Sequence, residues 1–209
     1  MQIQSQNYNP QFGARYIANC NGLHLYKITD RNDFKFLKDL SSRIKIDELM
    51  PNLSKQEADR WHEMLEYAVN CAHSSGNITY IETINNQPCG IITYNSDKNT
   101  TILDCICTWP VETGKKVCLA GKALFYQLFK DFKDSHGKKL KLDAITNGPY
   151  DVITKYEQLG FKRTSNVHPT KIEMEMSAPK VSETQRRLVD IIDYEPKVNE
   201  KVNLITELD

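Results

Sequence analysis

The 209-residue sequence predicts an α/β fold in which helices flank a mixed, mostly antiparallel central sheet. Residues 78–109 hold three β-rich runs joined by short polar turns, which is the pattern of an antiparallel meander. Residues 54–71 and 118–136 repeat apolar side chains at helical spacing. A strand pattern at 140–144 and a helix pattern at 150–159 then add a β-α-β crossover, so strands and helices belong to one mixed unit.

The first part of the chain predicts a polar extension, a strand and a helix. Residues 1–22 are polar and rich in Asn, and we assign them to an N-terminal extension. Apolar residues alternate over 23–29, which is typical of a short strand. Asp30 is a suitable N-cap for a helix over about 31–44, because its carboxylate can accept hydrogen bonds from free amides of the first turn.

The clearest helix start in the sequence is a capping box, in which Ser54 and Glu57 each satisfy a free backbone amide of the other residue. The amphipathic helix that follows is expected to run to about Cys71. Pro110 follows the third β-rich run and ends it, because proline has no amide to give to a ladder. The expected strands of the meander are 78–84, 90–94 and 100–109.

The second half of the chain alternates helices and strands. Gly160 is expected to close a helix at the position where left-handed residues are common, and the chain then turns into a further strand. Residues 23–177 form the predicted domain, and residues 178–209 form a C-terminal extension with a short helix pattern. The expected elements here are a helix at 118–136, a strand at 140–144, a helix at 150–159 and a last strand at 171–176.

The composition argues against several classes of function. Lys plus Arg and Asp plus Glu both number 27, so the net charge is zero and no overall field favours nucleic acid or an anionic membrane. The 6 Cys lack C-x-x-C spacing and the 5 His lack ligand spacing, so we expect reduced, packed thiols and no metal. The chain shows no leader pattern and no apolar run of about 20 residues, so we expect a cytoplasmic protein.

The helix at 150–159 ends in the most specific motif of the sequence. Tyr156-Glu-Gln-Leu-Gly-Phe161 resembles the Y-E-K-L-G-F ending of the fourth helix in the GNAT N-acetyltransferase family, and the element order over 78–176 is similar as well. This resemblance implies a GNAT-type fold and transfer of an acetyl group from acetyl-CoA to an amine of a small molecule or protein. A GNAT-fold module that binds acyl-CoA without turnover and an unrelated α/β domain stay open as alternatives.

The resemblance also implies where coenzyme A would bind. The family's pyrophosphate loop, Q/R-x-x-G-x-G/A, corresponds to 116–121, where Leu119 replaces the first glycine. A helix start suits phosphate because its amides are unpaired and its dipole end is positive, although small residues there also serve packing. In the family, the end of the preceding strand pairs with the pantetheine arm, and an upstream Asn contacts the cofactor. The implied cofactor-binding residues are Ile106, Cys107, Thr108, Lys116, Val117, Cys118, Leu119, Ala120, Gly121, Lys122 and Asn147.

Two residues are implied as catalytic. In the family, the tyrosine that matches Tyr156 protonates the departing thiolate, and Asp104 matches the place of a glutamate that serves some members as general base. An amine must lose its proton before it attacks, so a carboxylate is useful there. A core tyrosine and a strand aspartate that bonds a neighbouring hydroxyl are the structural alternatives. The acceptor walls would be 41–56 and 164–170, which identify no acceptor amine, and a homodimer stays open.

Overall fold

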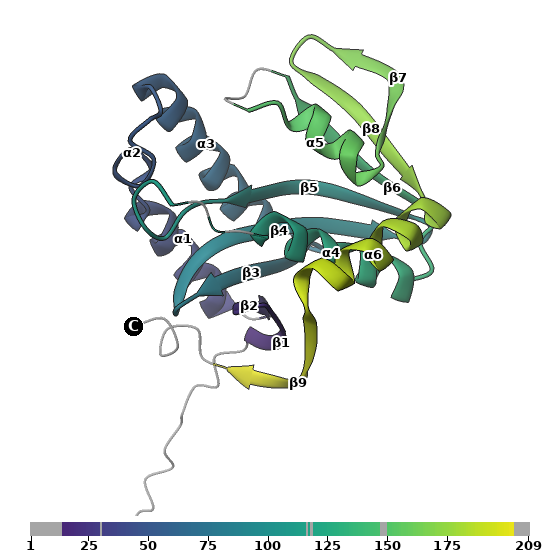
Figure 1. Ribbon diagram of the computed structural model, residues 1–209, viewed down its shortest axis with the longest axis horizontal. Helices are drawn as coiled ribbons and strands as arrows, with labels where there is room; N and C mark the ends of the chain where they lie inside the picture. The colour runs from purple at the N-terminus through teal and green to yellow at the C-terminus, as the bar shows by residue number, and fades with distance from the viewer. Residues whose placement is uncertain (1–13, 30, 116, 118, 147–149, 203–209) are drawn as a thin grey trace, which may run out of the picture.

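The computed structural model describes residues 14–29, 31–115, 117, 119–146 and 150–202. Within these residues nine strands form a single sheet in the order β7-β8-β6-β5-β4-β3-β2-β1-β9 (Figure 1). The strands are β1 (Ala14–Cys20), β2 (Leu23–Lys27), β3 (Ile78–Ile84), β4 (Gln87–Asp97), β5 (Thr100–Thr108), β6 (Lys139–Ile145), β7 (Lys162–His168), β8 (Lys171–Ser177) and β9 (Tyr194–Val202). The helices are α1 (Arg31–Arg43), α2 (Ile46–Leu49), α3 (Lys55–Ala72), α4 (Ala120–Asp134), α5 (Val152–Leu159) and α6 (Ala178–Ile192).

The sheet is mostly antiparallel, as the short turns of the sequence predict. Neighbouring strands pair antiparallel along the described sheet except β5 and β6, which are parallel. Two parallel strands need a crossover connection, and α4 provides it. The predicted mixed α/β fold is therefore confirmed.

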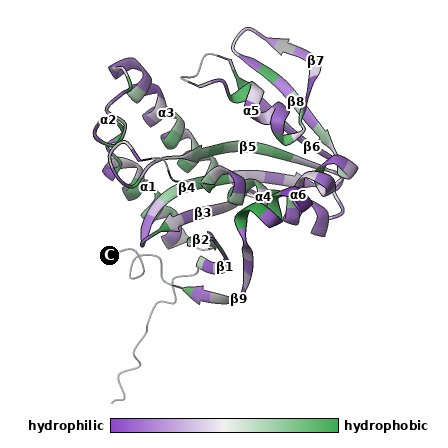
Figure 2. Ribbon diagram, viewed as in Figure 1, coloured by the Kyte–Doolittle hydropathy of each residue, from purple (hydrophilic) through white to green (hydrophobic). Residues whose placement is uncertain are grey.

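Helices cover both faces of the sheet and divide the core into two clusters. One cluster joins α4 and α6 to the sheet, with Leu128 and Phe129 fully buried. The other joins α1 and α3 to the opposite face, around Leu37 and Leu65. Figure 2 shows the hydrophobic residues along β5, in the middle of the sheet between these two layers. Residues along a strand alternate between the two clusters, as the period of two requires.

The capping box and the glycine helix end that the sequence predicts are present, whereas Asp30, the predicted N-cap of the first helix, lies outside the described residues. Ser54 and Glu57 form the capping box of α3, with the Ser54 amide donating to Glu57 Oε2 at 2.8 Å. Gly160 closes α5 in the left-handed conformation, with φ of 108°. The lengths of α1 and α4 also agree with the expectation within a few residues, which is the usual uncertainty of helix ends.

The predicted extensions at both ends of the chain contain strands that we did not predict. β1 lies within 1–22 and β9 lies within 178–209, and the two pair antiparallel at one edge of the sheet. The buried positions of β1 are Ala14, Ala18 and Cys20, which are too small to give a clear apolar alternation in the sequence. α6 is longer than its sequence pattern indicated, and the four-residue α2 was not predicted.

A buried polar network holds α4 against the sheet. Asp131 Oδ2 accepts hydrogen bonds from the hydroxyls of Tyr80 on β3 and Tyr94 on β4, each at 2.5 Å. Gln127 donates to Asp131 Oδ1 at 2.7 Å and accepts from the Tyr194 hydroxyl at 3.2 Å. Hydrogen bonds to a charged acceptor are stronger than neutral ones, so this network fixes α4 across two strands and ties it to the start of β9.

None of the described helices is long and apolar enough to cross a bilayer. The described Cys, His, Asp and Glu side chains form no group that could hold a metal ion. The described cysteines, which are Cys20, Cys71, Cys89, Cys105 and Cys107, are free thiols.

Glu82 is a carboxyl group in the interior of the sheet. It is fully buried on β3, opposite Gly90 of β4, and neither of its oxygens has a hydrogen-bond partner among the described residues. Burial raises the pKa of Glu82 well above its usual range, because a charged carboxylate loses its hydration there. Burial therefore favours the neutral acid form of Glu82 in the folded protein more than in the unfolded chain.

The stability of the protein should depend on pH through Glu82. A raised folded-state pKa gives stability that is complete below the unfolded-state pKa and is lost as pH rises toward the folded-state pKa. Glu82→Gln removes this titration. The unfolding free energy of the variant minus that of wild type should therefore rise by about 1.4 kcal/mol per pH unit, from about pH 4.5 up to the folded-state pKa of Glu82. Urea denaturation at several pH values measures the difference. Parallel curves for Glu82→Gln and wild type would contradict the assignment.

Candidate active site

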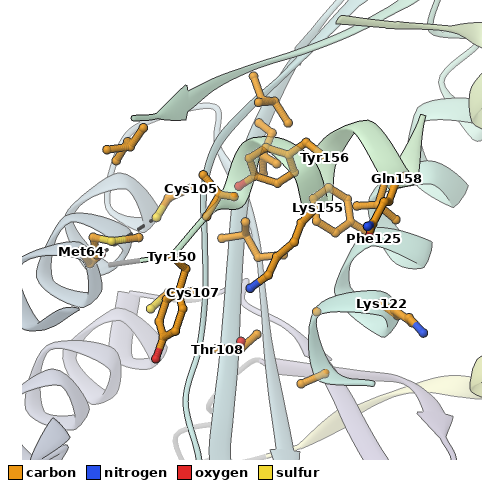
Figure 3. A pocket seen from close by; sticks show the side chains of 18 of the residues that line it. Met64, Cys105, Cys107, Thr108, Lys122, Phe125, Tyr150, Lys155, Tyr156 and Gln158 are labelled. Atoms are coloured by element: carbon orange, nitrogen blue, oxygen red, sulfur yellow. Dashed lines mark hydrogen bonds between the residues drawn. The ribbon is translucent and has the colours of Figure 1, made fainter. Parts of the chain in front are cut away.

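The cleft of the molecule opens where β5 and β6 part. Their parallel pairing runs from Thr100–Lys139 to Leu103–Leu142 and is not continued beyond that point. A cavity of about 870 Å³ lies there, lined by α3, both strands, the start of α4, α5 and the C-terminal half of α6. Figure 3 shows side chains of α3, β5, α4 and α5 converging on it. The cavity has the size of a small-molecule or cofactor site.

A β-bulge at Asp104 shapes the wall of this cleft. Thr93 of β4 pairs with Cys105, and the next residue, Tyr94, pairs with Leu103, so Asp104 is the extra residue on β5. Leu103 consequently packs in the α4 cluster, whereas Cys105 packs toward α3, although a regular strand would put both on one face. A bulge bends its strand, which turns the second half of β5 away from β6.

The open edge of β5 presents backbone groups to the cleft. The Trp109 amide donates to the Cys89 carbonyl at 2.9 Å, so this residue points its backbone groups toward β4. Because such groups alternate along a strand, Cys107 also points toward β4, while Ile106 and Thr108 point toward the side where β6 has departed. Ile106 and Thr108 can therefore hydrogen-bond an extended ligand that takes the place of a strand.

The first turn of α4 lies at one side of the cleft. α4 begins at Ala120, and its N-cap residue Leu119 offers no side-chain hydrogen bond to the free amides. Leu119 has φ of 71°, a left-handed conformation that costs a residue with a Cβ about 1–2 kcal/mol and that glycine adopts freely. Leu119 thus adopts a backbone conformation that glycine favours. A Cβ added at Gly121 would meet no atom within 4 Å, so this position faces open space.

Tyr156 stands on α5 with its hydroxyl directed toward β5 (Figure 3). α5 is oriented by Asp151, which caps it through the Thr154 amide at 3.0 Å. The Tyr156 ring lies edge-on to Phe125 and to Phe161, each with a centroid distance of 6.0 Å. Burial, with the nearby cysteine thiols, raises the pKa of Tyr156 above its usual value. The hydroxyl therefore keeps its proton at neutral pH and can donate it.

Asp104 lies on the α3 side of the cleft. Asn95 donates to both of its carboxylate oxygens, at 3.3 and 3.4 Å. Burial raises the pKa of Asp104, and the hydrogen bonds from Asn95 and Asn77 lower it less than burial raises it. A carboxylate with a raised pKa is a stronger base than one in water, which suits the removal of a proton from an amine.

The wall beside α3 is aromatic and apolar. Tyr150 lies edge-on to Trp61 at a centroid distance of 6.1 Å, and Met64 and Cys105 lie beside this pair (Figure 3). Lys155 holds its Nζ 5.0 Å from the centre of the Tyr150 ring. We did not predict Tyr150 or Lys155 as site residues, although their closeness to Tyr156 in the sequence was a usable signal.

The cleft brings together most of the predicted site residues. Lys116, Cys118 and Asn147 fall outside the described residues. Those that line the cleft are Asp104, Ile106, Cys107, Thr108, Val117, Leu119, Ala120, Gly121, Lys122 and Tyr156. Gln158, Arg187 and Ile191 also line it and were not predicted. No local motif marks Arg187 or Ile191, because only the packing of α6 brings them to the cleft.

Comparisons with known proteins show which solved structures share this fold. A scan against models of protein families found no match, and a search of curated proteins found no significant match. Among solved structures, apo FdhC, a nucleotide-linked sugar GNAT, is 14% identical, with a TM-score of 0.54 and coverage of 85% of this chain and 98% of that chain. PaiA N-acetyltransferase from Thermoplasma acidophilum, in complex with coenzyme A, is 17% identical, with a TM-score of 0.52 and coverage of 74% and 98%.

A third similar structure is a putative GNAT acetyltransferase from Desulfovibrio desulfuricans. It is 15% identical, with a TM-score of 0.51 and coverage of 75% of this chain and 99% of that chain. Because these sequence identities are low, the similarity shows a shared fold and nothing finer. The chain has the GNAT fold, as the Tyr156–Phe161 motif and the element order led us to expect.

Proposed function

We propose that this protein is an N-acetyltransferase that moves an acetyl group from acetyl-CoA to an amine. The observation that carries the proposal is the parting of β5 from β6, which creates a cleft with three complementary parts. These are the uncapped amides at the start of α4, the open backbone edge of β5 and the protonated hydroxyl of Tyr156. Phosphate, an extended amide chain and a departing thiolate are the chemical groups that match them.

We propose that acetyl-CoA lies along the cleft with its diphosphate at the start of α4 and its pantetheine arm beside β5. The amides of Ala120 and Gly121 would hold the diphosphate, which suits the positive end of the α4 dipole. Ile106 and the carbonyl of Thr108 would pair with the pantetheine arm as a neighbouring strand does, which leaves the Thr108 amide for the thioester oxygen. The coenzyme A complex of the similar PaiA N-acetyltransferase supports a ligand of this kind.

The proposed transfer is sequential. Asp104, directly or through water, takes a proton from the acceptor amine, whose nitrogen then attacks the thioester carbonyl carbon. The backbone amide of Thr108 stabilises the oxyanion of the tetrahedral intermediate. When the carbon–sulfur bond breaks, Tyr156 donates its proton to the sulfur. The amide nitrogen gives up its second proton, which returns through water to the Tyr156 oxygen, so that an amide and a free thiol leave the site. The free thiols of the described cysteines suit a cytoplasmic location.

One observation favours a second function, a module that binds acyl-CoA without turnover. Leu119 places a side chain where the family pattern has glycine, and this side chain lines the cleft beside the proposed diphosphate site. Substitution of Tyr156 separates the two functions, because turnover needs the hydroxyl and binding does not.

Tyr156→Phe is expected to reduce turnover by about 100-fold, because it removes the proton donor, and to leave acetyl-CoA affinity unchanged. Thiol release measures turnover, with an acceptor found by screening free amines and peptides. Tyr150→Phe is the matched control, since it removes a hydroxyl from the same cleft and should stay near wild-type activity. Full activity of Tyr156→Phe would exclude Tyr156 as the acid.

Asp104→Asn is expected to lower kcat/KM by about 100-fold and to alter its pH profile. A base must be ionised, so wild-type activity should fall as pH drops through the raised pKa of Asp104. The variant should lack this step and recover rate only as the acceptor amine itself loses its proton. Asp143→Asn is the control, because Asp143 also lines the cleft but is paired with Lys171 at 2.5 Å. A wild-type profile in Asp104→Asn would remove Asp104 from the mechanism.

Gly121→Val tests the diphosphate site. A Cβ at this position would meet no neighbouring atom within 4 Å, so the unliganded variant should melt at a temperature close to that of wild type. It would occupy the space of the diphosphate and lower acetyl-CoA affinity by about tenfold or more, an effect of at least about 1.4 kcal/mol. A thermal-shift titration measures both quantities, since a ligand of the folded state raises the melting temperature. If wild type shows no shift at saturating acetyl-CoA, the proposed function fails.

A further inference from the structure

We infer that the C-terminal helix α6 completes the coenzyme A site, and that Arg187 binds the 3′-phosphate at the nucleotide end. This inference rests on the proposed function and extends it to a segment that follows the last strand of the predicted domain. Its starting observation is that Arg187 and Ile191, one helical turn apart on α6, line the same cleft as Tyr156 and the start of α4.

α6 is a fixed part of the cleft wall. Val181, Leu188 and Ile192 lie in the core with 0%, 4% and 0% of their surface exposed. The Thr184 hydroxyl donates to the Leu159 carbonyl at 2.9 Å and so satisfies the last turn of α5. Figure 1 shows α6 crossing beside α4, and its C-terminal half reaches the cleft. These contacts position Arg187 on a rigid element rather than on a loose tail.

α5 and α6 also meet at Gly160. A Cβ at this position would stand 2.7 Å from Cε of Lys180 and 3.4 Å from Oγ1 of Thr184, both on α6. The φ of 108° at Gly160 is what requires glycine, whereas the Lys180 side chain could move aside. The end of the helix that carries Tyr156 is therefore in contact with the helix that carries Arg187.

The Arg187 guanidinium is available for a ligand. Glu183, one turn earlier on α6, is bonded to Lys180 at 2.7 Å, and the ion pairs found among the described residues do not include Arg187. Lys122 of α4 and Lys155 of α5 also line the cleft and likewise belong to none of those ion pairs (Figure 3). Each of these helices thus gives one cation to the cleft, which suits a ligand with several phosphates.

Of the phosphate groups of coenzyme A, the 3′-phosphate is the one that best matches Arg187. The start of α4 offers backbone amides, which suit the diphosphate. A terminal phosphate carries more charge and three free oxygens, and the planar fork of an arginine matches two of them at once. Ile191 is 45% exposed beside Arg187 and offers an apolar surface to the adenine ring. The lysines at 138, 139 and 141 are less suitable, because Lys139 and Lys141 are paired with Glu175 and Glu173.

Binding of coenzyme A and of 3′-dephospho-coenzyme A, measured by calorimetry, tests the inference. Wild type should bind coenzyme A about tenfold more tightly than the dephospho form, because one charged hydrogen-bonded contact is lost with the phosphate. Arg187→Ala should weaken coenzyme A binding to the level of the dephospho form and leave dephospho-coenzyme A binding unchanged. Arg186→Ala is the matched control, since Arg186 is exposed on the same helix and does not line the cleft.

The outcomes separate this inference from the proposed function. Equal losses for both ligands in Arg187→Ala, or no loss for either, would overturn the assignment of the 3′-phosphate while wild-type binding and turnover still support the acetyltransferase. Failure of wild type to bind either ligand would overturn both. Matching melting temperatures of the unliganded variants and wild type show that a change in affinity does not come from unfolding.

Discussion

The candidate site depends on the point at which β5 stops pairing with β6. A parallel ladder that continued to Thr108 would fill the space in which the cleft lies and would satisfy the backbone groups that now face it. The bulge at Asp104 bends β5 at this point, and Pro110 prevents the ladder from resuming further along. A few residues in the middle of the sheet therefore decide whether the fold is a closed sheet or a sheet with a binding cleft.

The groups around the cleft are held by contacts that lie outside it. The Asp131 network fixes α4 across β3 and β4, so the start of α4 points to the cleft without help from a ligand. The packing of Tyr156 between Phe125 and Phe161 sets the direction of its hydroxyl. α6 in turn packs against α4 and caps α5. Preorganised groups of this kind are what catalysis by positioning requires, because their ordering is complete before the ligand binds.

Leu119 departs from the family pattern in residue type, but its backbone conformation is one that glycine also adopts. The family pattern has glycine at this position, and this sequence has leucine. The backbone nevertheless adopts a left-handed φ of 71°, which glycine would also favour. The side chain packs partly against the α4 cluster, and this packing offsets part of the strain. The change therefore concerns the side chain in the cleft rather than the course of the chain.

The sequence alone determined the local elements, because capping boxes, turn residues and apolar periods are local features. It located α3, the meander and α5 with its Tyr156–Phe161 ending, and through them the fold and two candidate catalytic residues. Tertiary structure decided what depends on distant contacts. β1 and β9 are strands because they pair with each other at the edge of the sheet, and their small or polar residues give no signal by themselves. Arg187 joins the cleft because Leu188 and Thr184 anchor α6 to the rest of the core, and no pattern near Arg187 contains that information.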